Sequence, residues 1–318
     1  MPIIPSTYNK RPFYFINKHI ETVAPSLLYK GELVKYKRER LELVDGDFLD
    51  LDWLRSGSKK LAVLTHGFEG SSHRHYITRP SKYLQINGWD VLSWNCRSCS
   101  EEINRLPQFY HHGSTGDLDF VVQHALNYNY KFIALVGFSM GGSLNLKYIG
   151  EADRSDLIKA VVSFSTPCNL NDSARQLKQK GNWIYEDKFI RKIKKKIKIK
   201  TNMFPDIYQP DHLGLIKDFK SFHELYSHIF YGCRTIGEFH EDITCDKYFD
   251  GIKVPTLIAN AKNDPLLTGG CYPIEFASSS TNVFLEMPEF GGHVGFTLSK
   301  HKWTWMEYRL LQFLEEHI

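Results

Sequence analysis

The sequence lacks any apolar run long enough to cross a membrane. Its longest apolar stretches, such as Leu61 to Leu64 and Phe132 to Val136, have the length of a strand, whereas a membrane-spanning helix needs about 20 residues. The start, Met1-Pro2-Ile3-Ile4-Pro5, carries neither the basic residues nor the apolar core of a signal peptide. These absences predict a soluble, cytoplasmic protein.

A strong charge of one sign is also missing. The formal net charge is only +4 over 318 residues, which is too weak to indicate nucleic acid as a partner. The sequence contains no zinc-finger, helix-turn-helix or RNA-binding signature. Hydrophobic residues make up 42% and charged residues 24%, a composition that is typical of a globular chain rather than a disordered one. We therefore expect a folded protein without a nucleic-acid partner.

Cysteine is sparse, with six residues in the whole chain. Without a signal peptide, these residues are expected to be reduced thiols. Cys96-Arg97-Ser98-Cys99 has the spacing of a redox motif, but it has neither a second pair for zinc nor a thioredoxin-type setting. The cysteines are therefore predicted to be buried structural thiols, and no metal site is expected.

Strand-like and helix-like segments alternate through the first half of the chain. An antiparallel pair is expected at 34–44 and 48–54, around the turn Asp45-Gly46-Asp47. Strands then follow at 61–65, 89–94, 132–136 and 160–165, separated by helices near 76–87, 115–127 and 140–150. This order predicts an α/β fold with a mostly parallel sheet and helices on both of its faces.

The alternation stops at Pro167 and resumes near Pro255. It resumes with a strand at 255–261, a helix at 272–277, a strand at 282–286 and a final helix after Leu298 that includes Trp303, Met306, Leu310 and Phe313. The interrupting segment is rich in aromatic residues and predicts an inserted helical cap. We divide the chain into a core of 1–166 and 254–318, in which 1–30 form an N-terminal arm, and a cap of 167–253.

Gly137-Phe138-Ser139-Met140-Gly141 stands where an expected strand gives way to a helix. A serine hydroxyl is a weak nucleophile at neutral pH, so its catalytic use requires a tight turn that exposes it beside a base. Gly137 and Gly141 would let the strand and the helix approach closely. The pattern predicts that Ser139 is a nucleophile; an ordinary strand-turn-helix junction is the alternative.

An acid and a base follow the serine in the order that such a nucleophile requires. Asp264 comes directly after an expected strand, and Pro265 biases it away from a helix. His293 lies in the glycine-rich loop that follows the last strand. Alone, Asp264 could be a turn former and His293 a structural residue, but their joint order and position predict a catalytic triad with Ser139.

The oxyanion of a tetrahedral intermediate needs two N–H donors. The amide of Met140, next to the serine, is expected to supply one. The other is expected from the loop after the first parallel strand, where we assign the amide of Phe68, with that of Glu69 as a substitute. His66 in this loop is interpreted as a bracing residue rather than as a second base.

Four blocks of the sequence carry a family resemblance: Thr65 to Ser72, Gly137 to Gly142, Asn263-Asp264-Pro265 and Gly291 to Phe296. Together they resemble the YheT-like branch of the α/β-hydrolase superfamily, with further similarity at 95–100 and 110–117. Ser98 stands where this branch is expected to have glycine. The resemblance implies the α/β-hydrolase fold and the hydrolysis of carboxylic esters, with lipid esters as the substrates of some relatives.

Two further features have competing interpretations. His112 and Asp117 have the H-x4-D spacing of some acyltransferases, but helix capping and loop bracing are the preferred roles here. The basic segment, Arg191–Lys200, is interpreted as a cap helix that buries isoleucines while its lysines point toward solvent. Contact of this segment with anionic lipid or an acidic substrate is the alternative.

The sequence thus predicts a serine esterase that forms an acyl-enzyme on a small-molecule ester, with an apolar acyl chain received by the aromatic cap. This chemistry requires neither a metal nor an organic cofactor. Two alternatives stay open. The same triad could pass the acyl group to an alcohol or thiol, as an acyltransferase does, or the fold could serve as a catalytically idle binding module.

Overall fold

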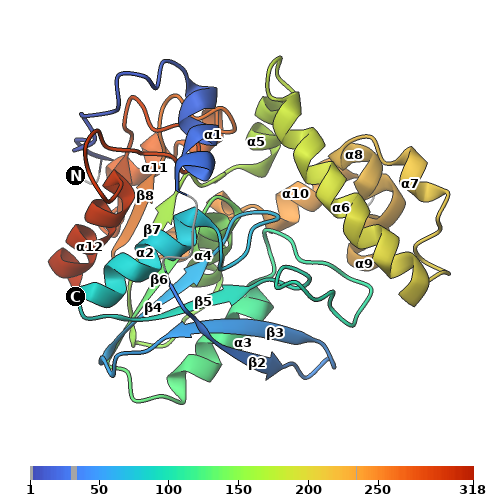
Figure 1. Cartoon of the computed structure of the whole chain (residues 1–318), viewed down its shortest axis with the longest axis horizontal. Coiled ribbons are helices and arrows are strands. Elements are labelled where there is room, and N and C mark those ends of the chain that lie inside the picture. Colours follow the sequence, from blue (N-terminus) through green and yellow to red (C-terminus); the bar gives the residue numbers. More distant parts are fainter. Residues whose placement is uncertain (1–2, 30–33, 234) are drawn as a thin grey trace.

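The computed structural model describes residues 3–29, 34–233 and 235–318 of the chain. Residues 1–2 and 30 of the predicted N-terminal arm and residue 234 of the predicted cap lie outside the described residues, as do residues 31–33. The described residues form a nine-stranded sheet (Figure 1). Its spatial order is β1 (Ile3–Ile4), β9 (Val283–Glu286), β8 (Thr256–Ala259), β7 (Ile158–Phe164), β6 (Phe132–Phe138), β4 (Lys60–Thr65), β5 (Asp90–Asn95), β3 (Phe48–Leu54) and β2 (Lys37–Glu42).

The sheet is mostly parallel. In this spatial order, each pair of neighbours from β1 through β9, β8, β7, β6 and β4 to β5 is parallel. The pairings of β3 with β5 and with β2 are antiparallel. The central strands are buried along almost their whole length, as expected for continuous apolar runs covered on both faces. The carboxyl ends of β6, β8 and β9 therefore point to the same edge of the sheet.

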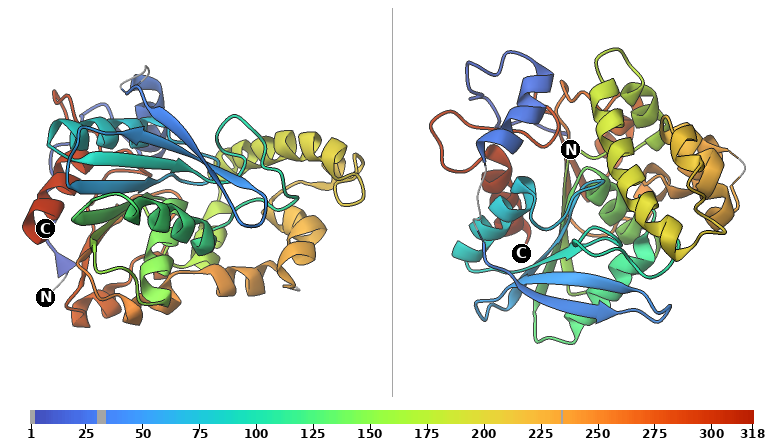
Figure 2. Two further views of the ribbon diagram at one scale, coloured as in Figure 1. Left: turned by 90° about the horizontal axis from the view of Figure 1, so that it is seen from below. Right: turned by 45° about the vertical axis from the view of Figure 1, so that its right-hand side comes forward.

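Helices cover both faces of the sheet, as the alternation predicted. One apolar layer includes residues of α2 (His75–Ile86) and α12 (Trp305–His317). The opposite layer includes residues of α3 (Thr115–Leu126), α4 (Met140–Glu151) and α11 (Ile274–Ser279), and Figure 2 shows the two layers on either side of the strands. The prediction that Trp303 belongs to the last helix is wrong: Thr304 and Glu307 form a capping box, so the helix begins at Trp305.

The N-terminal arm contains regular structure that the sequence did not predict. Strand β1 extends the sheet by pairing in parallel with β9. Helix α1 (Lys18–Leu28) follows and begins after Asn17, whose side chain accepts hydrogen bonds from the amides of His19 and Ile20. The arm thus places a helix near the loops that follow the last strands of the sheet.

The segment between β7 and β8 is mainly helical. It contains α5 (Leu170–Leu177), α6 (Trp183–Met203), α7 (His212–Leu215), α8 (Phe219–Phe222), the π-helical turn η1 (His223–Ser227), α9 (His228–Tyr231), α10 (Ile236–Ile243) and the 3-10 turn η2 (Asp246–Gly251). A short 3-10 turn, η3 (Gly269–Cys271), precedes α11. Helices α6 to α9 project beyond the sheet (Figure 1) and share an apolar cluster of their own, built around Ile193, Ile197 and Tyr226. The boundaries of a cap at 167 and 253 stay an interpretation of this arrangement.

Two predictions from composition can be compared with the structure. All six cysteines are free and buried, as predicted for structural thiols. Within the described ranges, no helix combines the length and the apolar character that a bilayer crossing requires. The cytoplasmic location stays a prediction.

Candidate active site

Ser139 occupies a strained turn between β6 and α4. Its backbone has φ 56° and ψ −123°, a conformation that costs free energy in a residue other than glycine. Its amide donates to the carbonyl of Phe164 in the neighbouring strand, at 2.9 Å. A Cβ atom at Gly137 would lie 2.4 Å from the carbonyl oxygen of Gly141, and one at Gly141 would lie 2.2 Å from that of Thr65. The two glycines therefore allow the close approach that the turn needs.

Asp264 and His293 reach Ser139 from the loops after β8 and β9. The Nδ1 atom of His293 lies 2.8 Å from Oδ2 of Asp264, and its Nε2 atom lies 2.9 Å from Oγ of Ser139. The other carboxylate oxygen of Asp264 accepts from the amide of Leu266 at 2.8 Å. Because a carboxylate only accepts, Nδ1 of His293 carries the proton and Nε2 is free to accept one from the serine. The three residues singled out in the sequence thus form one chain of hydrogen bonds.

The loop after β4 approaches the serine from the other side. A Cβ atom at Gly67 would lie 3.1 Å from Cβ of Ser139. His66 is fully buried; its Nδ1 lies 2.7 Å from the carbonyl oxygen of Gly67, and its Nε2 accepts from the amide of Cys96 at 3.1 Å. Burial lowers the pKa of His66 to about 4, so the ring is neutral near pH 7. Both ring nitrogens are occupied, which fits a bracing role.

Two amides near Ser139 are available to a ligand. Met140 is the first residue of α4, so its N–H has no acceptor within the helix. Within the described part of the chain, the N–H of Phe68 also has no hydrogen-bond acceptor. The N–H of Glu69, the substitute considered from the sequence, donates to the hydroxyl of Tyr110 at 2.7 Å. Of the two loop amides, that of Phe68 is therefore the available one.

A cavity of about 560 Å³ opens above Ser139 and His293. Its volume falls within the range of about 300–1,000 Å³ that small-molecule pockets occupy. Most of its wall comes from the helical segment between β7 and β8, whose aromatic contributors include Phe189, Phe219, Phe222, Phe230, Tyr231 and Phe239. Ser139 and His293 thus line a largely apolar cavity, the aromatic chamber.

The prediction that the lysines of the basic segment point toward solvent is wrong for three of them. Lys192, Lys196 and Lys200 recur every fourth residue and share one inward face of α6. Lys192 Nζ donates to the carbonyl of Glu69 at 2.6 Å, and Lys196 Nζ bonds the Glu69 carboxylate at 2.7 Å. Lys200 is fully buried and donates to the carbonyl of Leu106. Buried acceptors on the neighbouring loops draw these ammonium groups inward, so α6 is bonded to the loop that carries Phe68.

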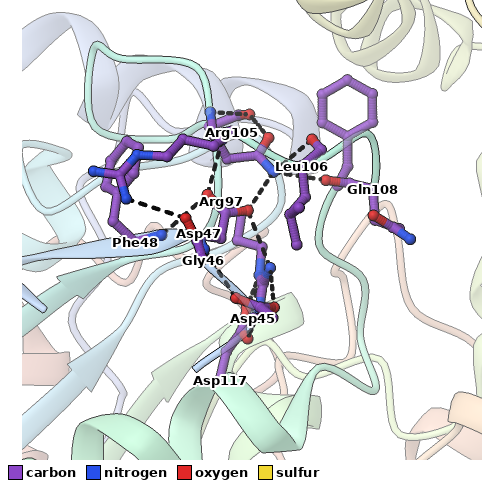
Figure 3. A network of polar contacts seen from close by, with 12 residues as sticks. Asp45, Gly46, Asp47, Phe48, Arg97, Arg105, Leu106, Gln108 and Asp117 are labelled. Carbon is purple, nitrogen blue, oxygen red and sulfur yellow. Dashed lines mark hydrogen bonds and ion pairs between the residues drawn. The ribbon is translucent and has the colours of Figure 1, made fainter. Parts of the chain in front are cut away.

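The prediction that Asp117 caps a helix is also wrong. Helix α3 begins after Ser114 without a side-chain cap, and the Asp117 carboxylate pairs with Arg97 at 2.8 Å. Arg97 also bonds Asp45 and Asp47, and Figure 3 shows this network at the turn between β2 and β3. Burial alone would raise the pKa of Asp47, but hydrogen bonds from Asn104 and backbone amides outweigh it and lower this pKa. Asp117 therefore braces loops, which was the other role preferred from the sequence.

Two residues of α1 that contact the loop of His293 were not predicted from the sequence. Glu21 is buried and accepts from the amide of Gly291 at 2.6 Å, and Thr22 accepts from the amide of His293 at 3.0 Å. These partners lie more than 250 positions away in the chain, so no local pattern could identify the contact. A lone acidic residue in the apolar stretch from Ile20 to Ala24 was the available signal.

Comparison with known proteins places these features among hydrolases. A family described as having the alpha/beta hydrolase fold matches residues 62–299. The chain is 25% identical to phospholipase ABHD3 of Bos taurus over 100% of this chain and 80% of that protein. It is 27% identical to the putative esterase YheT of Escherichia coli over 96% of this chain and 92% of that protein. An esterase of Pyrococcus furiosus shares the fold, with a TM-score of 0.58 and 21% identity over 89% of this chain and 91% of that one.

Proposed function

The chain belongs to the α/β-hydrolase fold family, in its YheT-like branch, and from this premise we propose that it hydrolyses carboxylic esters through an acyl-enzyme on Ser139. His293 takes the proton of the serine hydroxyl as the oxygen attacks the ester carbonyl. Asp264 orients the imidazole and stabilises its positive charge. The amides of Phe68 and Met140 donate hydrogen bonds to the oxyanion of the tetrahedral intermediate.

Collapse of this intermediate breaks the ester bond, and the proton held by His293 passes to the leaving alcohol. A water molecule then gives a proton to the same imidazole and attacks the acyl carbonyl. The second collapse returns that proton to Ser139 and releases the carboxylic acid. One base serves both halves of the reaction because it alternates between accepting and donating.

The observation that carries this proposal is the unbroken chain of contacts from Asp264 through His293 to Ser139, at 2.8 and 2.9 Å. A carboxylate and an imidazole in this order raise the nucleophilicity of a serine, and a structural serine has no need of them. The relatives named as esterases and phospholipase support ester bonds as the target. We further propose that the aromatic chamber receives an apolar acyl chain.

A fluorophosphonate probe tests the nucleophile. The wild-type protein is expected to form a covalent adduct at Ser139, and Ser139→Ala is expected to lose the adduct and to lower kcat by about 10⁶-fold. Ser163→Ala is the matched control, because Ser163 is a buried serine on β7, next to the strand that leads into Ser139. Mass spectrometry of the peptides locates the adduct. A wild-type protein without an adduct would favour the idle binding module.

A series of p-nitrophenyl esters from acetate to palmitate, assayed in the same preparations, tests the acyl chain. The value of kcat/KM is expected to rise by roughly fourfold per methylene until the chamber is filled, since a buried methylene contributes about 0.8 kcal/mol. Phe189→Ala is expected to reduce this gain for long chains and to leave acetate hydrolysis unchanged. A preference for acetate would contradict the apolar-chain proposal, and a dominant transfer product with added alcohol would favour an acyltransferase.

A further inference from the structure

Helix α1 lies against the two loops that deliver the acid and the base. In Figure 1 the helix (blue, top) lies beside the orange loops that follow β8 and β9. Its Glu21–Thr22 dipeptide is the point of contact. The proposed catalytic roles above use neither residue.

The Glu21 carboxylate joins the two loops. Its Oε2 atom accepts from the amide of Gly291 at 2.6 Å and from Nδ2 of Asn263 at 3.1 Å. Asn263 in turn accepts from the amide of Gly292 at 3.0 Å. Asn263 immediately precedes Asp264, and the two glycines immediately precede His293. A single buried carboxylate thus bonds both loops within two residues of the proposed acid and base.

Thr22 bonds the base directly. Its hydroxyl donates to the carbonyl of Lys18 at 2.7 Å, which orients the oxygen, and this oxygen accepts the backbone N–H of His293 at 3.0 Å. The position of the imidazole therefore depends on where α1 holds the backbone of His293.

The loop that carries His293 is strained and needs such support. Gly291 and Gly292 have φ values of 138° and 55°, and Val294 and Phe296 have φ values of 52° and 39°. A positive φ in a residue with a side chain costs about 1–3 kcal/mol, and it is most unfavourable for a β-branched residue such as valine. This backbone persists only where the surrounding structure holds it, and α1 supplies two of the hydrogen bonds that do so.

The glycines of this loop are also fitted to α1. A Cβ atom at Gly295 would lie 2.2 Å from the carbonyl oxygen of Glu21, and one at Gly292 would lie 2.8 Å from Oγ1 of Thr22. Residue 25 is proline and has no N–H, so the Glu21 carbonyl has no partner one turn further along the helix. The close approach of loop and helix is therefore built into both segments.

Burial and charge make the Glu21 contacts strong. The Glu21 side chain is 1% exposed, and its Oε1 atom pairs with Nη1 of Arg11 at 2.8 Å. Arg11 compensates the buried charge, and the N–H groups from the two loops bond an ionised acceptor. Hydrogen bonds to a charged acceptor are roughly twice as strong as those between neutral groups.

We propose that Glu21 and Thr22 are positioning residues that hold the loops of Asp264 and His293 together, so that the imidazole lies within reach of both Ser139 and the carboxylate. This proposal rests on the serine-hydrolase function proposed above. It assigns the N-terminal arm to the catalytic apparatus, although α1 contributes no reacting atom.

Two pairs of variants test the proposal on the full chain. Thr22→Val keeps the shape of the side chain and removes the acceptor for His293, whereas Thr22→Ser restores it. Glu21→Gln keeps the volume and removes the charge. Ser26→Ala, on the exposed side of α1, is the control. Kinetics on a p-nitrophenyl ester, melting temperatures and the proton NMR signal of the His293 Nδ1–H are measured for each variant.

Thr22→Val and Glu21→Gln are expected to lower kcat by roughly tenfold or more with KM within about twofold, because small displacements of reacting groups cost rate rather than binding. Thr22→Ser and Ser26→Ala are expected to keep the wild-type rate. The Nδ1–H signal is expected to broaden or shift only in the two impaired variants.

Wild-type kcat in Thr22→Val and Glu21→Gln would overturn the proposal. So would equal losses in Thr22→Val and Thr22→Ser, which would indicate a packing defect. If the wild-type protein neither turned over esters nor reacted with a fluorophosphonate, the proposed function would fail separately. The NMR signal would then decide the positioning role alone, since an unchanged signal in both variants would contradict it.

Discussion

Gly141 of α4 lies against the carbonyl of Thr65 at the end of β4, and no larger residue fits there. A Cβ atom would overlap the carbonyl oxygen of Thr65 at 2.2 Å. We expect Gly141→Ala to lower the free energy of unfolding by about 3 kcal/mol or to prevent folding, because overpacking against backbone cannot relax easily. Gly116→Ala in α3 is the control, since no heavy atom lies within 4 Å of the added Cβ.

In the control, the gain in helix propensity is expected to stabilise the protein by about 0.5–1 kcal/mol. Urea unfolding followed by circular dichroism measures both variants. Similar stability changes in the two would show that the contact between α4 and β4 is looser than the structure implies.

Single residues were predictable where a local pattern expresses the chemistry. Ser139 and Met140 follow from the strand-turn-helix pattern, and Asp264 and His293 from their order after strands. Ser98 is a different case, because the YheT-like branch is expected to have glycine at this position. Its φ of 63° is a conformation that glycine favours, so the backbone turn forms although the residue is serine. Glu21 could not be predicted because its partners come from the opposite end of the chain.

Helix α6 is bonded to the loop that carries Phe68 through a buried ion pair. Lys196 and Glu69 expose only 14% and 5% of their side chains. Lys196→Met is expected to destabilise the protein by about 3 kcal/mol, because removing one partner leaves a buried charge uncompensated. It is also expected to lower kcat, since the loop that carries Phe68, the proposed oxyanion donor, loses its ion pair with α6.

Lys198→Met provides the matched control on the same helix, because the side chain of Lys198 is exposed. Its stability and kcat are expected to stay at wild-type values. Thermal melts and ester kinetics measure both variants. If Lys196→Met also behaved like the wild type, the ion pair would be dispensable for both stability and the loop.

At the scale of elements, the strands other than β1 were predicted within a few residues, because buried parallel strands are short apolar runs between turn residues. The direction of the lysines on α6 was not predictable, because their buried acceptors lie on loops about 90 to 130 positions away. Helix α1 was missed because Pro25 in its interior reads as a helix breaker, although Ile20, Val23, Ala24, Leu27 and Leu28 recur at helical spacing. Tertiary contacts, rather than propensity, decide both cases.

Across the whole molecule, several buried and half-buried histidines make stability depend on pH. Burial lowers the pKa to about 4 for His66, His75, His111 and His240, and to about 3 for His112. In the unfolded chain these rings titrate near pH 6.5. Between these values the unfolded state binds more protons, so the free energy of unfolding falls as the pH is lowered from about 6.5 to about 4.

Each such histidine contributes a loss of up to roughly 1.4 kcal/mol per pH unit inside this window. The melting temperature of the wild type is expected to fall from pH 7 through pH 6 to pH 5. The melting temperature of His75→Asn is expected to fall less steeply over the same range. His301→Asn, at an exposed histidine, is the control and should follow the wild type. If the melting temperatures of the wild type and His75→Asn changed equally with pH, a contribution from His75 would be excluded.

The contact between Glu21 and Gly291 spans 270 positions of the chain. During biosynthesis, Glu21 leaves the ribosome long before the segment that it supports has been translated. The arm therefore stays unpaired with that segment until the residues up to Gly291 have emerged. Helix α1 can therefore take its place against the two loops only after β9 and the loop that follows it have been synthesised.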